Sequence, residues 1–522
     1  PVHALVAERK LVVVTDSGNV SCFAEEGRDQ PAVDTAAGQE KGPYNSPSNG
    51  YACLLGCGDL AQARSLALDQ DYRVVVFEPD PAKAAAARAG LVEAGIYGRQ
   101  VQVLQASPAT TLITPYWASL VVCESVESLG SPEPVLKTAL NALRPYSGRL
   151  LLPQGRPFAD LIERLLADRT GYAMKLDGEE IAVHRLAPPE GADDWTHEAG
   201  GPDNAFANSD RLVQWPLAAL WYSGDVDRYF TPASHFQHER HPYPLVVGGR
   251  MFLITGQQLH AIDVYTGSYL WKAEMPITPW IQTRLFDSRI YGRPTERNCV
   301  AAADWVYAVT GEKIHAYDAA TGRQMKVFEI PPQLREQAKG AIHTPQERTF
   351  MGHRGTIQAA PLWTEVRLSD DLLLAMLGSN LTALDRHTGN VRWTRPSTRQ
   401  TTTYALGEAM LFGLDCHVPP LGGGKTEKLS GSLFAMDPQT GEISWQEDLE
   451  YGSVPKHQVD HARTWLRPII PLLSYNAKHG LIVMTVNRNS LHVFRAADGS
   501  PVWSKTTLNQ GNLQRVYPPV VT

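Results

Sequence analysis

The chain has 522 residues, of which 43% are hydrophobic and 20% are charged, and its formal net charge is −7. This balance is that of a globular protein with ample material for hydrophobic cores. The negative charge and the lack of any run of Lys or Arg argue against a nucleic-acid-binding protein, which would carry a basic stripe. No stretch reaches the roughly 18 consecutive apolar residues of a membrane helix, so we expect no transmembrane segment.

The first 26 residues are predicted to form strands. Residues 10–23, KLVVVTDSGNVSCF, match a strand, a turn and a second strand. The chain starts at Pro1 with this strand-like sequence and not with a basic segment followed by an apolar one, so we expect no signal peptide in this sequence. Residues 27–50 are rich in Gly, Pro, Ser, Gln and Asn, a composition that predicts a linker.

Residues 51–190 are predicted to form an inserted α/β domain, because short apolar strands alternate with helical stretches as in a parallel sheet. Strands are expected at YACLLGCG, RVVVFEPD, VQVLQAS, SLVVCES and RLLLPQ, helices at DLAQARSLALDQ and PAKAAAARAGLVEAG, and a hairpin at YAMKLDGEEIAVHRL. Cys53, Cys57 and Cys123 fall on these strands or on the first turn, so we expect buried free thiols there.

The turn after the first of these strands predicts a ligand site. Gly56 and Gly58 would let the backbone approach a ligand at a helix N-terminus. Glu78 ends the second strand 20 residues after Gly58, where an acidic residue would bind ribose hydroxyls. The run from Gly56 to Ala61 also satisfies the dinucleotide fingerprint G-x-G-x-x-A, so a nicotinamide cofactor stays open at this point.

Two motifs favour a class I methyltransferase fold. LLGCGD (54–59) resembles the first motif of that family, and LRPYSGRL (143–150) resembles the turn before its fifth strand. The resemblance implies that S-adenosylmethionine is bound by Gly56, Gly58, Asp59, Glu78, Ser107 and Glu124. Two departures weaken it: Ala106-Ser107 stands where the family has an acidic residue, and Cys123-Glu124-Ser125 lacks the Asn-Pro-Pro-Tyr motif of the amino-methylating enzymes.

Two further segments join this domain to the rest of the chain, DDWTHEAGGPDNAFANSD (193–210) and LAALWYSGD (217–225). They resemble the segment that opens the repeat region in quinoprotein-like proteins of planctomycete-type bacteria. Some of those proteins also carry a methyltransferase-like domain at this junction. The resemblance informs the fold far more than the activity.

The last part of the chain is a repeat of strand, Asp, Gly turn, and strand ending in Trp. Its copies are LHAIDVYTGSYLW (259–271), IHAYDAATGRQMK (314–326), LTALDRHTGNVRW (381–393), LFAMDPQTGEISW (433–445) and LHVFRAADGSPVW (491–503). Copies made of strands and turns that recur every 52 to 67 residues predict a propeller. We expect the Trp side chains to pack between blades. Lys326 replaces Trp in the second copy and Arg495 replaces Asp in the fifth, so those blades should be less regular.

This repeat resembles the tryptophan-docking repeat of pyrroloquinoline-quinone-dependent alcohol dehydrogenases and of outer-membrane assembly propeller lipoproteins. The implied fold is mixed: an all-β propeller of the quinoprotein alcohol dehydrogenase-like type, formed by residues 1–26 and 191–522, with a Rossmann-like methyltransferase-fold insert at 51–190. Six blades or part-blades are visible, and a longer chain would have seven or eight. The dehydrogenases carry a vicinal Cys pair that this sequence lacks, so we do not expect the quinone (PQQ).

Candidate catalytic residues lie before two of the repeats. His235, His238 and His241 precede the first repeat, and Arg293 and Arg297 take the equivalent place before the second. Imidazoles from different blades can converge on a metal in a central funnel, so the three histidines are also candidate metal ligands. The alternative is that all five are loop residues in turns and surface hydrogen bonds.

Three functions remain open. The first, and our main expectation, is a binding or scaffold protein whose funnel takes a glycan, a small molecule or a protein. The second is an active S-adenosylmethionine-dependent methyltransferase whose acceptor is bound by the propeller. The third is a propeller enzyme, either a metal-assisted lyase or hydrolase or a quinoprotein-type oxidoreductase. Resemblance to exported propellers implies an exported or periplasmic protein, whereas an active methyltransferase would be cytoplasmic because its donor is cytosolic.

Overall fold

The computed structural model of the chain describes residues 49–58, 60–221, 244–255, 258–275, 299–310, 313–335, 363–417, 427–454, 471–486 and 490–506, and the backbone of five further strands. The chain divides into two compact units, Pro1–Asn45 and Ser46–Thr522. The first unit holds an antiparallel sheet with strand order β1-β2-β3, formed by β1 (His3–Ala7), β2 (Lys10–Val14) and β3 (Val20–Ala24).

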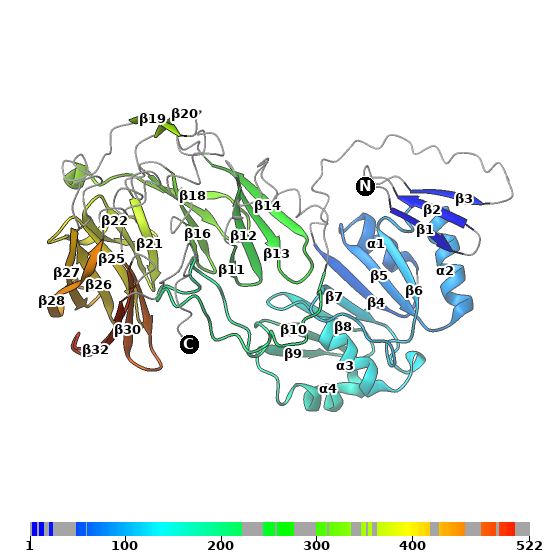
Figure 1. The fold of residues 1–522 in the computed structure, drawn as a ribbon. Coiled ribbons are helices and arrows are strands. Elements are labelled where there is room, and N and C mark those ends of the chain that lie inside the picture. Colours follow the sequence, from blue (N-terminus) through cyan, green and yellow to red (C-terminus); the bar gives the residue numbers. More distant parts are fainter. Residues whose placement is uncertain are drawn as a thin grey trace. The chain divides into compact units, whose positions relative to one another are not determined.

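The second unit begins with a seven-stranded sheet in the order β6-β5-β4-β7-β8-β10-β9 (Figure 1). Strands β4 to β8 run parallel, and β10 runs antiparallel to both β8 and β9. The strands are β4 (Tyr51–Leu55), β5 (Arg73–Glu78), β6 (Val101–Gln105), β7 (Ala118–Cys123), β8 (Gly148–Leu152), β9 (Tyr172–Asp177) and β10 (Glu180–Arg185). The five predicted parallel strands and the predicted hairpin are confirmed.

Helices cover both faces of this sheet. The helices are α1 (Leu60–Leu68), α2 (Pro81–Glu93), α3 (Pro132–Ala142) and α4 (Ala159–Leu166), with short 3-10 turns η1 (Glu127–Leu129) and η2 (Arg156–Phe158). Apolar residues of α1 and α2 pack on one face, and those of α3 and α4 pack on the other. Asp80 caps α2, because its carboxylate accepts from the backbone N–H groups of Ala82 and Lys83.

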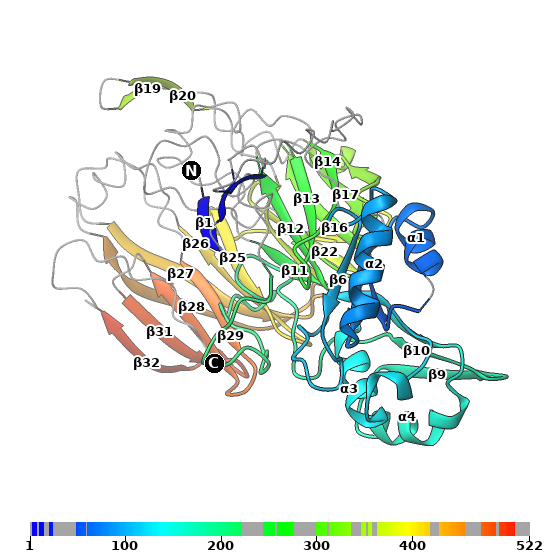
Figure 2. The same cartoon turned by 90° about the vertical axis from the view of Figure 1, so that its right-hand side faces the viewer.

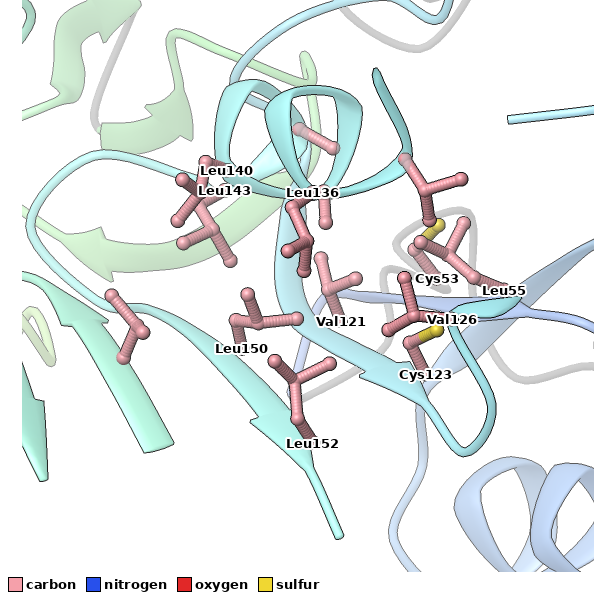
Figure 3. Packing of buried hydrophobic residues seen from close by; sticks show 14 of the residues in the cluster. Cys53, Leu55, Val121, Cys123, Val126, Leu136, Leu140, Leu143, Leu150 and Leu152 are labelled. Atoms are coloured by element: carbon pink, nitrogen blue, oxygen red, sulfur yellow. The ribbon is translucent and has the colours of Figure 1, made fainter. Parts of the chain in front are cut away.

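The face under α3 buries two of the cysteines predicted to be free thiols. Cys53 on β4 and Cys123 on β7 lie among leucines and valines of the cluster (Figure 3). Cys57 is buried in the turn after β4, and all three are free. Burial raises the pKa of the Cys123 thiol to about 12, so this group stays protonated and unreactive at neutral pH.

Five four-stranded antiparallel sheets follow, which we call blades 1 to 5 (Figure 1, Figure 2). The first strands of successive blades contact one another, β11 with β15, β15 with β21, β21 with β25, and β25 with β29. Sheets that meet along their first strands in chain order are the blades of a propeller. The strands are, for blade 1, β11 (Leu245–Val247), β12 (Arg250–Thr255), β13 (Gln258–Asp263) and β14 (Tyr269–Glu274); for blade 2, β15 (Cys299–Ala301), β16 (Trp305–Thr310), β17 (Lys313–Asp318) and β18 (Gln324–Phe328); for blade 3, β21 (Trp363–Ser369), β22 (Leu372–Leu377), β23 (Asn380–Asp385) and β24 (Val391–Pro396); for blade 4, β25 (Thr401–Leu406), β26 (Leu411–Cys416), β27 (Glu427–Met436) and β28 (Ile443–Val454); and for blade 5, β29 (Leu472–Asn476), β30 (Leu481–Val486), β31 (Ser490–Arg495) and β32 (Pro501–Thr506).

Two smaller elements lie between blades 2 and 3 in the sequence. The 3-10 turn η3 (Pro332–Leu334) follows β18, and β19 (Gln346–Phe350) and β20 (His353–Ile357) form a two-stranded antiparallel ladder.

Tryptophans lock successive blades together, as the repeat predicts. Each of three fourth-strand tryptophans packs against the turn glycine of the next blade, where an added Cβ would lie between 2.4 and 3.0 Å from the ring. The pairs are Trp271 with Gly322, Trp393 with Gly441 and Trp445 with Gly499. Their indole N–H groups donate to the backbone oxygens of Ala319, Pro438 and Ala496. The repeat therefore encodes the contact between blades and not only the strands.

The second repeat is more regular than its sequence predicts. Lys326 replaces its tryptophan, but Phe328 lies two residues further along β18 and packs on Gly389 of blade 3, where an added Cβ would lie 2.5 Å from the ring. Side chains two apart share a face of a strand, so Phe328 reaches the same inter-blade space. The expectation that blade 2 would be less regular was wrong for this reason.

Trp221 fills the same position ahead of blade 1. Its ring packs on Gly267, and its N–H donates to the backbone oxygen of Val264 at 2.7 Å. This is the geometry of the other docking tryptophans. The segment LAALWYSGD therefore supplies the residue that a preceding blade would supply from its fourth strand.

A segment that we call the strap, residues 195–206, crosses the innermost strands of all five blades. Trp195 pairs with Val246 of β11. Backbone groups of the strap also bond to Ala301 of β15, Leu406 of β25 and Tyr475 of β29, and the ring of His197 accepts from the N–H of Leu368 in β21. These partners lie at or next to the last residue of each innermost strand. The strap therefore covers the end of the propeller where these strands finish.

Asn204 is the most connected side chain of the strap, and it is fully buried. Its amide donates to the backbone oxygens of Tyr404 and Leu473 at 3.0 and 2.9 Å. Its side-chain oxygen accepts from the buried Arg367 at 2.8 Å, and its backbone oxygen accepts from Ser474. One residue thus joins blades 3, 4 and 5.

Four buried histidines are held neutral in the propeller. They are His197, His260, His315 and His492. Burial lowers the pKa of each of them, to about 4 for His260, and the charge of Arg367 adds to burial at His197. An unfolded histidine titrates near pH 6.5, so below that pH the unfolded chain binds more protons than the folded chain. The free energy of unfolding should therefore fall as the pH drops from 7.5 to 5.5.

Replacing His260 by phenylalanine should remove part of this pH dependence. Phe434 already occupies the equivalent repeat position in blade 4, so the ring fits the fold. We expect the loss of unfolding free energy between pH 7.5 and 5.5 to shrink by about 1 kcal/mol, measured by denaturant titration at both pH values. His479→Gln, at an exposed position, is the control and should leave the dependence unchanged. Equal effects of the two substitutions would contradict the conclusion that buried His260 contributes to the pH dependence of stability.

Candidate functional site

The carboxyl edge of the parallel sheet collects the candidate cofactor residues. Helix α1 follows β4 on one face and α3 follows β7 on the other, so the chain reverses direction between β4 and β7. In such sheets, ligands bind in the crevice at this switch point, outside the carboxyl ends of the strands. Gly56 and Gly58 follow β4, Glu78 ends β5, Ser107 follows β6 and Glu124 follows β7. Asp59 lies outside the described residues.

The turn after β4 needs glycine at both ends. Gly56 has φ of +93° and Gly58 has φ of +38°, a region that other residues rarely adopt. A Cβ on Gly58 would lie 2.6 Å from a carboxylate oxygen of Glu124. The turn therefore brings bare backbone against the carboxylate that follows β7.

Glu78 ties this turn to the start of α2. The residue is only 5% exposed, and its carboxylate accepts from the N–H of Cys57 at 2.8 Å and from the N–H of Asp80 at 2.9 Å. The Cys57 thiol also hydrogen-bonds to this carboxylate, which has about four acceptor positions, so about one position is left for a hydroxyl group. Burial, with Glu78 adding to it, raises the pKa of the Cys57 thiol to about 11, which argues against a thiolate nucleophile in the turn.

Ser107 shapes the turn after β6. Its hydroxyl accepts from the N–H of Ala109 at 3.3 Å, and its backbone oxygen accepts from the N–H of Thr111 at 2.9 Å. The hydroxyl also donates to the backbone oxygen of Leu129 at 3.4 Å, so the side chain links its own turn to the turn after β7. The acidic residue that the methyltransferase family has at this point is absent, as the sequence shows.

A surface pocket of about 590 Å³ runs along the face of the sheet that α3 also covers, from the carboxyl ends of β5 and β6 to the amino ends of β4 and β7. Phe77 and Ala106, which directly precede Glu78 and Ser107, belong to its lining. The pocket also includes Tyr51 and Trp117, whose rings meet edge to face at 6.0 Å. Its volume is within the range of small-molecule sites, and its walls are largely apolar.

The candidate residues of the propeller funnel cannot be placed. His235, His238, His241, Arg293 and Arg297 lie outside the described residues, so the metal and catalytic roles assigned to them stay predictions. Within the part of the chain that the structure describes, no group of three or more His, Cys, Asp or Glu side chains is arranged to hold a metal ion. No described helix is both long enough and apolar enough to cross a membrane.

A sequence model of the family described as outer membrane protein assembly factor BamB matches residues 179–505, more than half of the chain. The chain belongs to this family. Membership supports the quinoprotein-like propeller and, at a coarse level, a binding or scaffold role. The α/β sheet of residues 51–185 lies almost wholly outside the matched region.

The solved structures to which the chain is similar include propellers and an α/β protein. BamB from Moraxella catarrhalis is 16% identical and aligns over 51% of this chain and 63% of its own, with a TM-score of 0.29. The quinohemoprotein alcohol dehydrogenase ADHIIG from Pseudomonas putida HK5 is 15% identical over 60% of this chain and 48% of its own (TM-score 0.34). This chain thus spans between about half and two thirds of these relatives.

The α/β protein comes from Methanococcus maripaludis and is described as an S-adenosyl-L-methionine-dependent methyltransferase. It is 15% identical over 27% of this chain and 78% of its own, with a TM-score of 0.23. A comparison with curated proteins found no match.

Proposed function

We propose that this chain is a binding or scaffold protein in which the propeller recognises a partner and the α/β domain binds S-adenosylmethionine. The observation that carries the proposal is the glycine turn at the switch point. Gly56 and Gly58 present backbone at the carboxyl edge, and the Glu78 carboxylate at the end of β5 has about one acceptor position left.

The donor set fits the chemistry of this ligand. Glu78 would accept from the ribose hydroxyls, and Glu124, beside Gly58, would pair with the ammonium of the methionine part. The pocket bordered by Phe77 and Ala106 offers apolar surface next to the ribose position. Bound S-adenosylmethionine would supply an activated methyl group at this edge.

The sheet itself favours a single nucleoside over a dinucleotide. Dinucleotide-binding sheets combine two βαβαβ halves in the order 3-2-1-4-5-6. In this domain, the antiparallel strand β10 takes the place next to β8 where the sixth parallel strand would lie. The second half is therefore incomplete, which supports S-adenosylmethionine and argues against NAD.

The location of the protein in the cell bears on whether a bound donor is used for methyl transfer. The family's description favours an exported protein. Because the methyl donor is cytosolic, an exported location favours binding over methyl transfer. Cell fractionation distinguishes the two, since a cytoplasmic chain would favour the active methyltransferase instead.

Calorimetric titration of the whole chain tests the proposal. We expect S-adenosylmethionine and S-adenosylhomocysteine to bind with dissociation constants on the order of micromolar and NAD to bind at least about tenfold more weakly. Gly58→Ala should weaken binding at least about tenfold, because the new methyl group would collide with Glu124.

Gly98→Ala is the matched control. Gly98 also has positive φ, +77°, but a Cβ there would meet nothing within 4 Å. This substitution should carry similar backbone strain and leave donor affinity unchanged. Absence of binding to the unsubstituted chain, or equal losses in both variants, would overturn the proposal.

A further inference from the structure

The α/β domain docks on blade 1 through the edge of its sheet opposite to the proposed donor site. Arg144, in the turn before β8, donates through Nε to Asp263 at the end of β13. The ring of Tyr116, just before β7, lies 6.0 Å from that of Tyr265. Arg185, the last residue of β10, lies over the ring of Tyr116 at 4.8 Å.

These docking residues all belong to the amino edge of the parallel strands. Arg185 pairs with Gly148, the first residue of β8, and Tyr116 precedes the first residue of β7. The glycine turn and Glu124 lie at the other ends of the strands. Strands of five or six residues at about 3.3 Å per residue separate the two edges by roughly 17 to 20 Å.

We infer that the molecule that meets a donor bound at the carboxyl edge is a separate, basic protein segment and not a ligand held by this chain's own propeller. The inference rests on the proposed function. The docking contacts keep blade 1 at the amino edge, and the chain leaves the domain toward the strap from that same edge, after β10. The donor edge is therefore turned away from blade 1 and from the strap.

The charge of the donor edge selects the partner. Exposed carboxylates lie in the turns after β5 and β7 and in the β9–β10 hairpin. They are those of Asp80, Glu124, Glu127, Asp177, Glu179 and Glu180. The exposed basic side chains in or next to these turns are Lys83 and Arg156, and Lys175 is paired with Asp177. The half-buried Arg88 lines the neighbouring pocket, so the carboxylates outnumber the cations at this edge without being the only charges there. A negative rim around a site attracts a Lys- or Arg-rich segment and repels an acidic one.

Binding of a Lys/Arg-rich peptide to the whole chain saturated with S-adenosylhomocysteine tests the inference. We expect Glu127→Lys combined with Glu180→Lys to weaken peptide binding at least about tenfold, and the wild-type affinity to fall with added salt. The matched control is Glu442→Lys with Glu447→Lys, two exposed carboxylates of blade 4. It makes the same change in net charge and should alter affinity less than about twofold.

Further measurements distinguish a failure of the peptide-binding inference from a failure of the proposed donor site. Arg144→Ala weakens the docking contact but leaves the rim intact, so it should keep peptide affinity. Equal losses in the two charge-reversed variants, or no peptide binding by a chain that binds S-adenosylhomocysteine, would overturn the inference and leave the donor site standing. A chain that does not bind S-adenosylhomocysteine would overturn the proposed function instead.

Discussion

Replacing Asp415 by alanine is expected to lower the free energy of unfolding of the propeller by about 3 to 5 kcal/mol. The carboxylate is fully buried and receives both guanidinium nitrogens of Arg395, at 3.0 and 2.7 Å. The hydroxyls of Thr398 and Thr402 also donate to it. Burial alone would raise the pKa of Asp415, but Arg395 and Thr402 outweigh it and hold the pKa below its usual value.

Removal of this carboxylate would leave the guanidinium of Arg395, whose side chain is only 11% exposed, without its partner between blades 3 and 4. Urea unfolding followed by tryptophan fluorescence measures the effect. Glu329→Ala is the control, because Glu329 pairs with Lys313 on the surface and exposed pairs contribute at most about 1 kcal/mol. A loss at Asp415 no larger than that at Glu329 would mean that the buried pair does not hold these blades together.

Asn204→Ala is expected to cost about 3 to 4 kcal/mol of unfolding free energy. The change leaves the backbone oxygens of Tyr404 and Leu473 without their donor and takes one acceptor from Arg367. It also places alanine at φ of +57°, which asparagine tolerates better.

The control for this substitution lies just beyond the strap. Asn208→Ala removes an exposed amide whose hydrogen bond to Asp194 measures 3.4 Å, and it should change stability by less than about 0.5 kcal/mol. Both variants are compared by urea unfolding. Similar small losses would mean that the strap lies on the blades without bracing them.

Local sequence patterns were enough to predict most helices and strands and the contacts between blades. Alternating strands and helices predicted the α/β sheet, and the Gly and Trp positions of the repeat predicted the docking of one blade on the next. The docking role of Phe328 was not predicted, because in this repeat the docking side chain lies two residues further along its strand, on the same face. The docking role of Trp221 was not predicted, because its segment lacks the Asp and Gly turn of the repeat.

The strap could not be predicted, because its partners are remote in sequence. Asn204 bonds to Leu473, 269 residues later, and no local periodicity records such a contact. The candidate donor site was predictable in outline, since parallel strands bring their carboxyl ends to one edge. The approach of Glu124 to Gly58 and the hydrogen bonds of Ser107 to Ala109 and Leu129 depend on backbone geometry that the sequence does not state.

Docking by the amino edge also changes how the two domains are understood. The methyltransferase hypothesis drawn from the sequence gave the propeller the task of holding the acceptor. Arg144 and Tyr116 instead fix the domain with its glycine turn at the far edge from blade 1. A scaffold that displays a donor-binding domain to other molecules fits this arrangement better.

A crystal structure of the whole chain grown with S-adenosylhomocysteine would show directly whether the donor binds at the glycine turn. We expect the ligand at the carboxyl edge, with its ribose hydroxyls on Glu78, its amino group by Glu124 and its backbone contacts at Gly56 and Gly58. The Arg144–Asp263 contact should remain at the opposite edge. A ligand bound elsewhere, or none at a concentration that saturates the protein in solution, would contradict the claim.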